Sequence, residues 1–367
     1  MRVFHVQGSG FAELSGIPAA LPDAGFLWLA SSRDGFSAQA ADLQATLQRY
    51  GCGALVDEHV SDLLNDQLPS HFDTTSWYDL LVFRRLAAGL PSASLPGDNT
   101  DSTAETARLT LTTIDTSPVG FAAFDRVLIT VHPADCGVLE FFAERLATLV
   151  TAGDGRGTAR LPASPADLML RMVNHMVDNY LALRRLLTRQ LGLLQEQLLD
   201  ARKRFDDWAM LLESRNALHT LEDTCEDQSS ALQEWIDALD EWPAEADAQG
   251  QRERELLRVR SRDVLEHIER VLSHVRRLEQ SAETAVQLHF SALGHRTNDI
   301  MRTLTVLTAV FLPLNLITGF FGMNFDHLPL IHNGTGVWIA IGAMLMVALG
   351  LAGFFWRRRY LGNSRPD

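Results

Sequence analysis

The sequence is poor in cysteine, and the three cysteines that it has are scattered. Cys52, Cys136 and Cys225 lack the pairwise spacing of a zinc site, and they suggest no disulfide framework. Three unpaired thiols suit a reducing cytoplasm. The beginning of the chain also lacks an apolar core of about 7 to 15 residues, so we expect no signal peptide.

Positive charge is scarce as well, because 32 Lys and Arg residues stand against 46 Asp and Glu residues. The formal net charge is −14 at pH 7, which makes the chain a poor partner for nucleic acid and a suitable one for cations. For any single carboxylate, the alternative to a role in cation binding is a place on the ordinary solvated surface. The sequence has no Walker motif, and no nucleophile, base and orienting group can be named together. We therefore expect neither ATP coupling nor an enzyme.

Two long apolar runs dominate the end of the chain, over residues 304–321 and 337–356, and neither contains a charge. At about 1.5 Å per residue, each is long enough to cross the roughly 30 Å hydrocarbon core of a bilayer. We therefore expect two transmembrane helices, joined by an external loop over residues 322–336.

The basic tail over residues 357–367 sets the expected orientation. Arg357, Arg358 and Arg359 follow the second run directly. An excess of Arg and Lys beside a span marks its cytoplasmic side. With two spans, the N-terminal part and the C-terminus should both be cytoplasmic.

Residues 1–161 predict a cytoplasmic domain of the α/β or α+β class. Strand-like runs at 25–30, 80–83, 108–112 and 126–131 alternate with helix-like runs at 38–50 and 138–150. The segment 87–106 is rich in Pro, Ser, Gly and Asp, so it predicts an exposed loop.

Residues 162–250 predict a pair of long helices, the second of them acidic. Apolar residues recur every three or four positions from Met169 to Leu198, which places one stripe on one helix face and indicates packing rather than a metal site. We expect the first helix to end near Glu213 and the second near Glu241.

A third helix should run from about Arg252 to Phe321, because no strong helix breaker intervenes. Its cytoplasmic part, over residues 251–303, would form a stalk, and its last part is the first apolar run. Pro313 interrupts one backbone hydrogen bond, which a membrane helix tolerates.

One face of this helix carries polar side chains into the apolar run. Its members follow one another at three or four residues: Asn298, Met301, Leu304, Thr308, Leu312, Asn315 and Gly319. An Asn facing lipid is costly, so Asn315 should face a partner helix or water. Interhelical hydrogen bonding between Asn and Thr side chains is the alternative to an aqueous path.

The end of the first run reads FLPLNLITGFFGMNFDHLP and contains the triplet Gly322, Met323 and Asn324. A Gly-Met-Asn triplet at this place in a C-terminal two-span hairpin resembles the CorA family of divalent-cation channels. Two positions depart from the family pattern. Phe321 stands where Tyr is common, and Leu330 stands where a second loop acid is often found.

The resemblance implies a funnel-shaped homopentamer in the bacterial inner membrane, surrounded by lipid. Its first-span helices would surround a path for divalent cations (Mg²⁺, Co²⁺ or Ni²⁺), lined by the polar face and closed by apolar rings of Leu304 and Leu312. Gly322, Met323 and Asn324 would select the hydrated ion, and Asp326 would add charge at the outer mouth. The cations would be substrates and regulators, without any cofactor.

Two further assignments stay open. Asp263 lies in a stretch that reads RDVLEH and resembles a family segment binding regulatory Mg²⁺, although an exposed carboxylate paired with Arg260 or Arg262 is the alternative. His327 and His332 in the external loop suit Zn²⁺ or Ni²⁺ better than Mg²⁺, so the ZntB-like zinc-transporting branch is an alternative, as are plain solvated histidines. An alternative from another class is a membrane-anchored coiled-coil receptor or scaffold.

Overall fold

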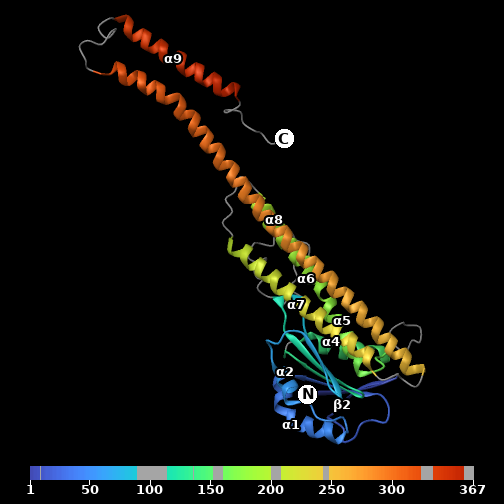
Figure 1. The fold of residues 1–367 in the computed structure, drawn as a ribbon. Helices are drawn as coiled ribbons and strands as arrows, with labels where there is room; N and C mark the ends of the chain where they lie inside the picture. The colour runs from blue at the N-terminus through green and yellow to red at the C-terminus, as the bar shows by residue number, and fades with distance from the viewer. Residues whose placement is uncertain are drawn as a thin grey trace. The chain divides into compact units, whose positions relative to one another are not determined.

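The computed structural model describes residues 1–8, 10–88, 114–134, 136–151, 160–199, 208–242, 248–323 and 334–358. The chain divides into two compact units, Met1–Glu283 and Thr284–Asp367. Figure 1 shows the course of the chain through the labelled helices and strands. The predicted strand at 108–112 lies outside the described residues, as does all of the predicted loop at 87–106 after Ala88.

The first unit is built on a seven-stranded sheet. In spatial order its strands are β2 (Gly10–Leu14), β1 (Arg2–Gln7), β3 (Phe26–Ser32), β9 (Val127–His132), β8 (Pro118–Phe124), β5 (Tyr78–Arg84) and β4 (His71–Thr74). Neighbouring strands are antiparallel except for β3 and β9, which are parallel. A separate short pair joins β6 (Ala87–Ala88) to β7 (Ile114–Asp115). The predicted mixed α/β class is confirmed, and the runs at 25–30, 80–83 and 126–131 are strands.

Helices cover both faces of this sheet, which explains why its central strands are buried along nearly their whole length. On one face, α1 (Arg33–Arg49) and α2 (Asp57–Leu64) bury Phe36, Leu43 and Leu63 against the strands. The approach of α2 is close, because a Cβ on Gly120 of β8 would lie 2.4 Å from the Leu63 side chain. Contacts on the other face come from α4 (Gly137–Thr151), α5 (Pro165–Asp178) and α7 (Trp208–Glu241).

Local signals place two of these helices. The Ser32 side chain accepts a hydrogen bond from the Gly35 N–H at the start of α1, and Ser164 does the same for the Asp167 N–H at the start of α5. Pro165 follows at the first helical position of α5, where its missing N–H costs nothing. These caps fix the residues at which α1 and α5 begin.

The prediction of a single first long helix from about Pro165 to Glu213 is wrong. The structure has α5 ending at Asp178, a separate helix α6 (Tyr180–Leu199), and Glu213 inside α7. Residues 200–207, between α6 and α7, lie outside the described residues and contain neither Pro nor Gly. The sequence therefore carried no breaker to mark the boundary.

The third predicted helix is confirmed as α8 (Ala248–Phe321), a single helix of 74 residues with Pro313 inside it. Its part in the first unit packs on α7 through a buried hydrogen bond. The Trp235 indole N–H donates to the Ser261 hydroxyl at 2.9 Å, and this hydroxyl donates to the Leu257 carbonyl oxygen at 2.8 Å. Trp235 and Ser261 are both fully buried.

Ser261→Ala should lower the free energy of unfolding of the first unit by about 1 to 3 kcal/mol, because it leaves the Trp235 N–H buried without an acceptor. Calorimetry of the purified full-length protein would record this loss as a lower Tm. Ser273→Ala, at an exposed position of the same helix, is the matched control. Equal Tm values for the two variants would contradict the role assigned to this hydrogen bond.

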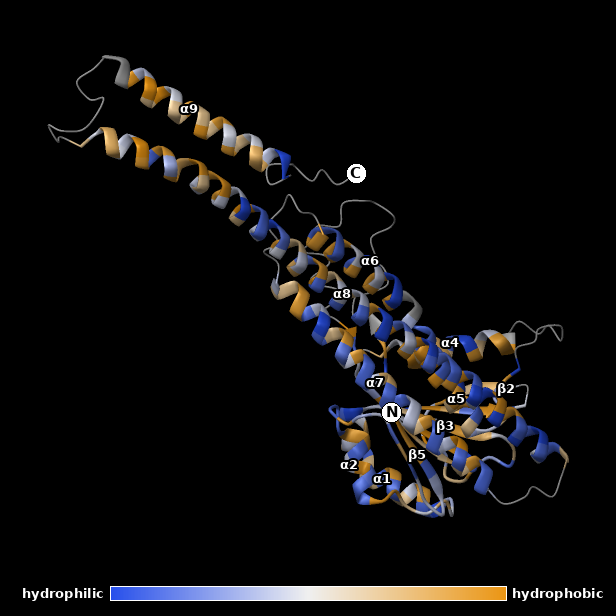
Figure 2. Cartoon of the chain, turned by 45° about the horizontal axis from the view of Figure 1, so that its top comes forward, coloured by the Kyte–Doolittle hydropathy of each residue, from blue (hydrophilic) through white to orange (hydrophobic). Residues whose placement is uncertain are grey.

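The second unit contains the end of α8 and the helix α9 (Gly334–Arg357). Both are apolar over a membrane-spanning length, as Figure 2 shows by their hydropathy colouring. Most of their large apolar side chains are exposed in this single chain, among them Leu316 and Met346. Surfaces of this kind need lipid or other protein as their neighbour.

Candidate functional site

The seven residues of the predicted polar face all lie on α8 and are all exposed, from Asn298 to Gly319. At about 100° per residue along a helix, they fall within an arc of about 120°. Met301, Leu304 and Leu312 are 59%, 56% and 68% exposed. The helix therefore presents one continuous face in which amide, hydroxyl and apolar groups alternate.

The hydroxyl groups near this face are occupied within the helix. Thr308 donates to the Leu304 carbonyl oxygen at 2.9 Å, and Thr318 donates to the Asn315 carbonyl oxygen at 3.1 Å. No side-chain hydrogen bond of Asn315 is found within the described residues, and Asn315 is exposed. Its amide therefore requires a partner such as water, an ion or another protein chain.

The triplet begins where α8 ends. The Gly322 N–H donates to the Thr318 carbonyl oxygen at 2.9 Å, and the Met323 N–H donates to the Phe320 carbonyl oxygen at 3.4 Å. A Cβ on Gly322 would lie 3.0 Å from the Thr318 carbonyl oxygen, so a larger residue would crowd the final turn. The remaining predicted site residues, Asn324, Asp326, His327 and His332, lie outside the described residues.

Asp263 is an exposed residue of α8 in the first unit. One of the two arginines considered as its partner is engaged elsewhere, because Arg260 pairs with Asp167. Asp167 is buried and also accepts hydrogen bonds from Arg171. Among the described residues, no ion pair of Asp263 is found, and no group of three His, Cys, Asp or Glu side chains could hold a metal ion. A regulatory site at Asp263 therefore needs further ligands.

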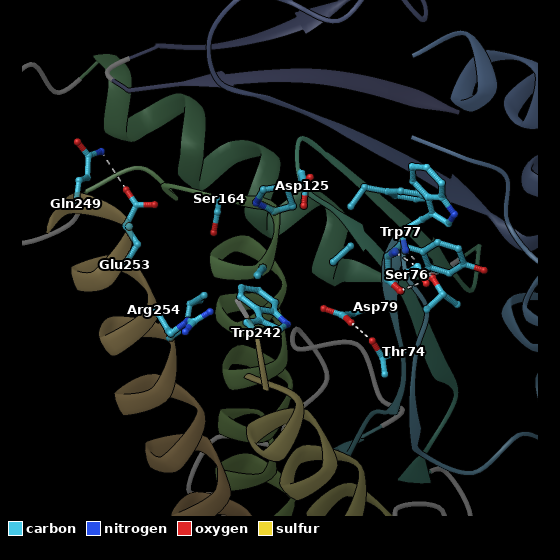
Figure 3. A pocket seen from close by; sticks show the side chains of 18 residues that line it. Thr74, Ser76, Trp77, Asp79, Asp125, Ser164, Trp242, Gln249, Glu253 and Arg254 are labelled. Atoms are coloured by element: carbon cyan, nitrogen blue, oxygen red, sulfur yellow. Dashed lines mark hydrogen bonds between the residues drawn. The ribbon is translucent and has the colours of Figure 1, made fainter. Parts of the chain in front are cut away.

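The first unit contains a cavity of about 760 Å³ that no sequence pattern predicted. It lies beside β4 and β5 and the beginnings of α5 and α8, and Figure 3 shows Trp77, Trp242, Asp79 and Asp125 around it. Asp79 is only 8% exposed and accepts a hydrogen bond from the Thr74 hydroxyl at 2.7 Å.

Burial raises the pKa of the Asp79 carboxyl, the Thr74 hydrogen bond partly opposes this rise, and the charge of Asp125 adds to it. The folded chain therefore holds this proton more tightly than the unfolded chain does. Ionised Asp79 opposes folding, so its contribution to stability falls as pH rises from the unfolded pKa through the folded pKa.

Asp79→Asn should accordingly raise Tm near neutral pH, because it removes the buried charge and keeps an oxygen for Thr74. The gain should shrink as pH falls toward the ordinary carboxyl pKa of about 4. Thermal unfolding at a series of pH values measures this. Asp23→Asn, at an exposed carboxylate, controls for the loss of one negative charge. A lower Tm for Asp79→Asn at neutral pH would show that the ionised carboxylate stabilises the fold instead.

The fold and the polar face of α8 together define a structural class. In this class, a mixed α/β unit is followed by two helices that are long and apolar enough to cross a membrane, here within Ala248–Phe321 and Val337–Arg357. The family described as "CorA-like Mg2+ transporter protein" matches residues 96–359, which is more than half of the chain. The chain belongs to the CorA family.

Two solved structures share the fold over nearly the whole chain. The complete CorA magnesium transporter of Methanocaldococcus jannaschii is similar with a TM-score of 0.66 and 16% identity, over 97% of each chain. The full-length CmaX protein is similar with a TM-score of 0.62 and 17% identity, over 98% of this chain and 97% of that one. The predicted architecture of an α/β domain, a long helix and two C-terminal apolar helices is thereby confirmed.

Similarity to curated proteins is confined to part of their length. The cobalt/magnesium transport protein CorA of Thermotoga maritima is 26% identical over 100 residues, which is 27% of this chain and 28% of that protein. The magnesium transport protein CorA of Haemophilus influenzae is 33% identical over 101 residues, which is 28% of this chain and 32% of that protein. The chain thus aligns with less than a third of the length of either relative.

Proposed function

We propose that this chain is one subunit of a homopentameric divalent-cation channel in the bacterial inner membrane. The observation that carries the proposal is that Asn315 and Thr308 are exposed on one face of the charge-free run of α8 over residues 304–321. Copies of this face around a common axis would line a water-filled path and remove the amide from lipid. Membership of the CorA family supports the same assignment.

The proposed selective element is the triplet Gly322, Met323 and Asn324. Mg²⁺ loses its water shell reluctantly, so a site that demanded full dehydration would exclude it. Neutral oxygens of the Gly322 carbonyl and the Asn324 amide can hydrogen-bond to the hydrated ion without trapping it. A ring of Asp326 carboxylates would raise the local cation concentration at the outer mouth.

The proposed orientation places both termini in the cytoplasm, with Arg357 and Arg358 at the cytoplasmic end of α9. The membrane potential then drives uptake. It is worth about 4.6 kcal/mol per 100 mV for a doubly charged ion, which needs no ATP.

Ion competition in proteoliposomes tests which cation is the substrate. Vesicles holding the purified protein are offered Mg²⁺, Co²⁺, Ni²⁺ or Zn²⁺ singly and then in pairs. We expect Mg²⁺ uptake, slowed by Co²⁺ and Ni²⁺. Uptake of Zn²⁺ alone would overturn the magnesium assignment in favour of the ZntB-like branch, and His327 and His332 would be the next residues to replace.

Asp263 is proposed to bind regulatory metal at a contact between subunits, where other chains supply the missing ligands. Asp263→Ala should then keep the channel conducting at internal Mg²⁺ concentrations that close the unsubstituted protein. Flux from vesicles loaded with increasing Mg²⁺ measures this. Glu269→Ala, at an exposed carboxylate of the same helix, should leave the closing concentration unchanged. If both variants close normally, Asp263 is not a sensor ligand.

A further inference from the structure

A small internal cavity lies in the Met1–Glu283 unit, between strand β9 and the helices α4 and α5. Its volume is about 10 Å³, which is room for one water-sized sphere or one ion. The lining side chains that carry nitrogen, oxygen or sulfur are Trp28, Thr130, His132, Cys136 and Met172, and the rest of the lining is aliphatic. None of these residues belongs to the proposed ion path.

His132 brings an imidazole nitrogen without a partner to this cavity. It is 7% exposed, and its buried Nε2 makes no hydrogen bond to any described residue. Its Nδ1 lies 3.1 Å from the Pro133 carbonyl oxygen, which can only accept, so Nδ1 carries the proton of the neutral ring. Nε2 therefore keeps a free lone pair at the outer edge of the ring. A metal-binding histidine is held in the same way, with its second nitrogen donating to an acceptor.

The same carbonyl oxygen holds Cys136 beside His132. The Cys136 N–H donates to the Pro133 carbonyl oxygen at 3.2 Å, so one acceptor anchors both residues. Cys136 is a free thiol, is 5% exposed and directly precedes α4. The N–H groups of Val138 and Leu139, in the first turn of α4, donate to its sulfur. Donors at a helix N-terminus favour the thiolate, which is the form that binds a metal.

Met172 of α5 supplies a second sulfur. It is 1% exposed, and its place in the apolar stripe predicts packing, yet its side chain also lines the cavity. The Trp28 indole N–H is already engaged, because it donates to the Thr130 hydroxyl at 3.0 Å. The described residues contain no group of three His, Cys, Asp or Glu side chains that could hold a metal ion, so a thioether has to complete a set of three ligands here.

These ligands favour a soft, singly charged ion. Thiolate and thioether sulfur select Cu⁺, whereas Mg²⁺ takes oxygen ligands. One thiolate neutralises Cu⁺, but a divalent ion would keep a net positive charge in an aliphatic cavity, which is costly. The surroundings are already positive. Burial lowers the pKa of His132, the Pro133 contact opposes this, and the charges of Arg85 and Arg33 lower the pKa further.

We propose that this cavity binds one Cu⁺ ion, with His132 Nε2 and the sulfur atoms of Cys136 and Met172 as its ligands. On binding, the S–H bond of Cys136 breaks, its proton leaves to solvent and a Cu–S bond forms, while copper remains Cu⁺. The ion links strand β9 to the helices α4 and α5. The proposal does not depend on the function assigned to the membrane helices.

Competition with a chromophoric Cu⁺ chelator, bicinchoninate, tests the proposal. The metal-free full-length protein is titrated without oxygen, and the copper that it withdraws from the chelator is counted per chain. We expect one Cu⁺ per chain, displaced by Ag⁺ but not by excess Mg²⁺ or Zn²⁺. Failure to withdraw Cu⁺ from the chelator would overturn the site, and displacement by Zn²⁺ would overturn the preference for a singly charged ion.

Replacement of the thiol locates the bound copper. Cys136→Ala should weaken the affinity for Cu⁺ about a hundredfold or more, because it removes the charged ligand. Cys225→Ala removes another buried free thiol, which does not line the cavity, and should leave the affinity unchanged. Equal losses in the two variants would reveal non-specific binding to thiols and overturn the site.

Met172→Leu separates metal binding from folding, because leucine has nearly the volume of methionine. The variant should keep its Tm without metal and bind Cu⁺ about tenfold more weakly. Met169→Leu, buried on the same helix but outside the cavity lining, is the matched control. Unchanged affinity in Met172→Leu would remove the thioether from the ligand set. X-ray absorption of the copper complex should show sulfur and nitrogen neighbours, and nitrogen alone would assign the ion to other histidines.

Discussion

Asn324→Ala is expected to abolish divalent-cation flux while the protein still inserts and assembles. The substitution removes an amide from every subunit of the proposed ring, so the hydrated ion loses a full set of hydrogen-bond partners at once. It leaves the apolar lengths of α8 and α9 unchanged, because Asn324 follows the last turn of α8. Metal uptake into proteoliposomes measures the flux, and cross-linking in the membrane measures assembly.

The matched control is Asn333→Ala, which removes an amide from the same loop outside the triplet. We expect it to retain flux. Normal flux in Asn324→Ala would show that the triplet is not part of the ion path. Loss of flux in both variants would instead indicate that flux is sensitive to substitution anywhere in the loop, and not to the triplet in particular.

The second large effect on cation flux is expected from a substitution at Leu312, an apolar member of the polar face of α8. Leu312→Asn should raise cation flux severalfold under conditions that close the unsubstituted channel. Leu312 is 68% exposed on the face shared with Asn315, so copies of it would form an apolar ring. Such a ring closes a path by excluding water, and an amide at this position would keep it wet. Efflux from vesicles loaded with Mg²⁺ is the measurement.

Leu314→Asn is the control for this prediction, because Leu314 lies on the same helical turn but outside the arc of the polar face. A new amide there should leave the closed state closed. If Leu314→Asn leaked as much as Leu312→Asn, the leak would come from general disruption of the helix, and the apolar ring would lose its support.

Strong, long patterns in the sequence predicted the fold well. The charge-free runs and the unbroken periodicity before them predicted α8 as one helix, and α9 begins only three residues before the second run, at Gly334. Strands β3, β5 and β9 were evident from β-branched and large apolar residues. By contrast, β8 was not singled out, because it begins at Pro118 and is rich in Gly and Ala, which are weak strand formers.

Only the part of the candidate ion path that lies within a single chain could be predicted from the sequence. The face from Asn298 to Gly319 follows from helical spacing and is present on α8. A ring of such faces depends on contacts between copies, which no periodicity within one chain specifies. The two cavities arise from side chains that are distant in sequence, such as Trp28 and Met172, so local patterns gave no sign of them.

The most direct test of the central claim is Mg²⁺ uptake into proteoliposomes, with and without an imposed inside-negative potential, for the unsubstituted protein and for Asn324→Ala. The account predicts uptake that rises with the potential in the unsubstituted protein and is absent in the variant. Uptake that does not depend on the potential would contradict a passive channel. Uptake that persists in Asn324→Ala would contradict a place for the triplet in the ion path.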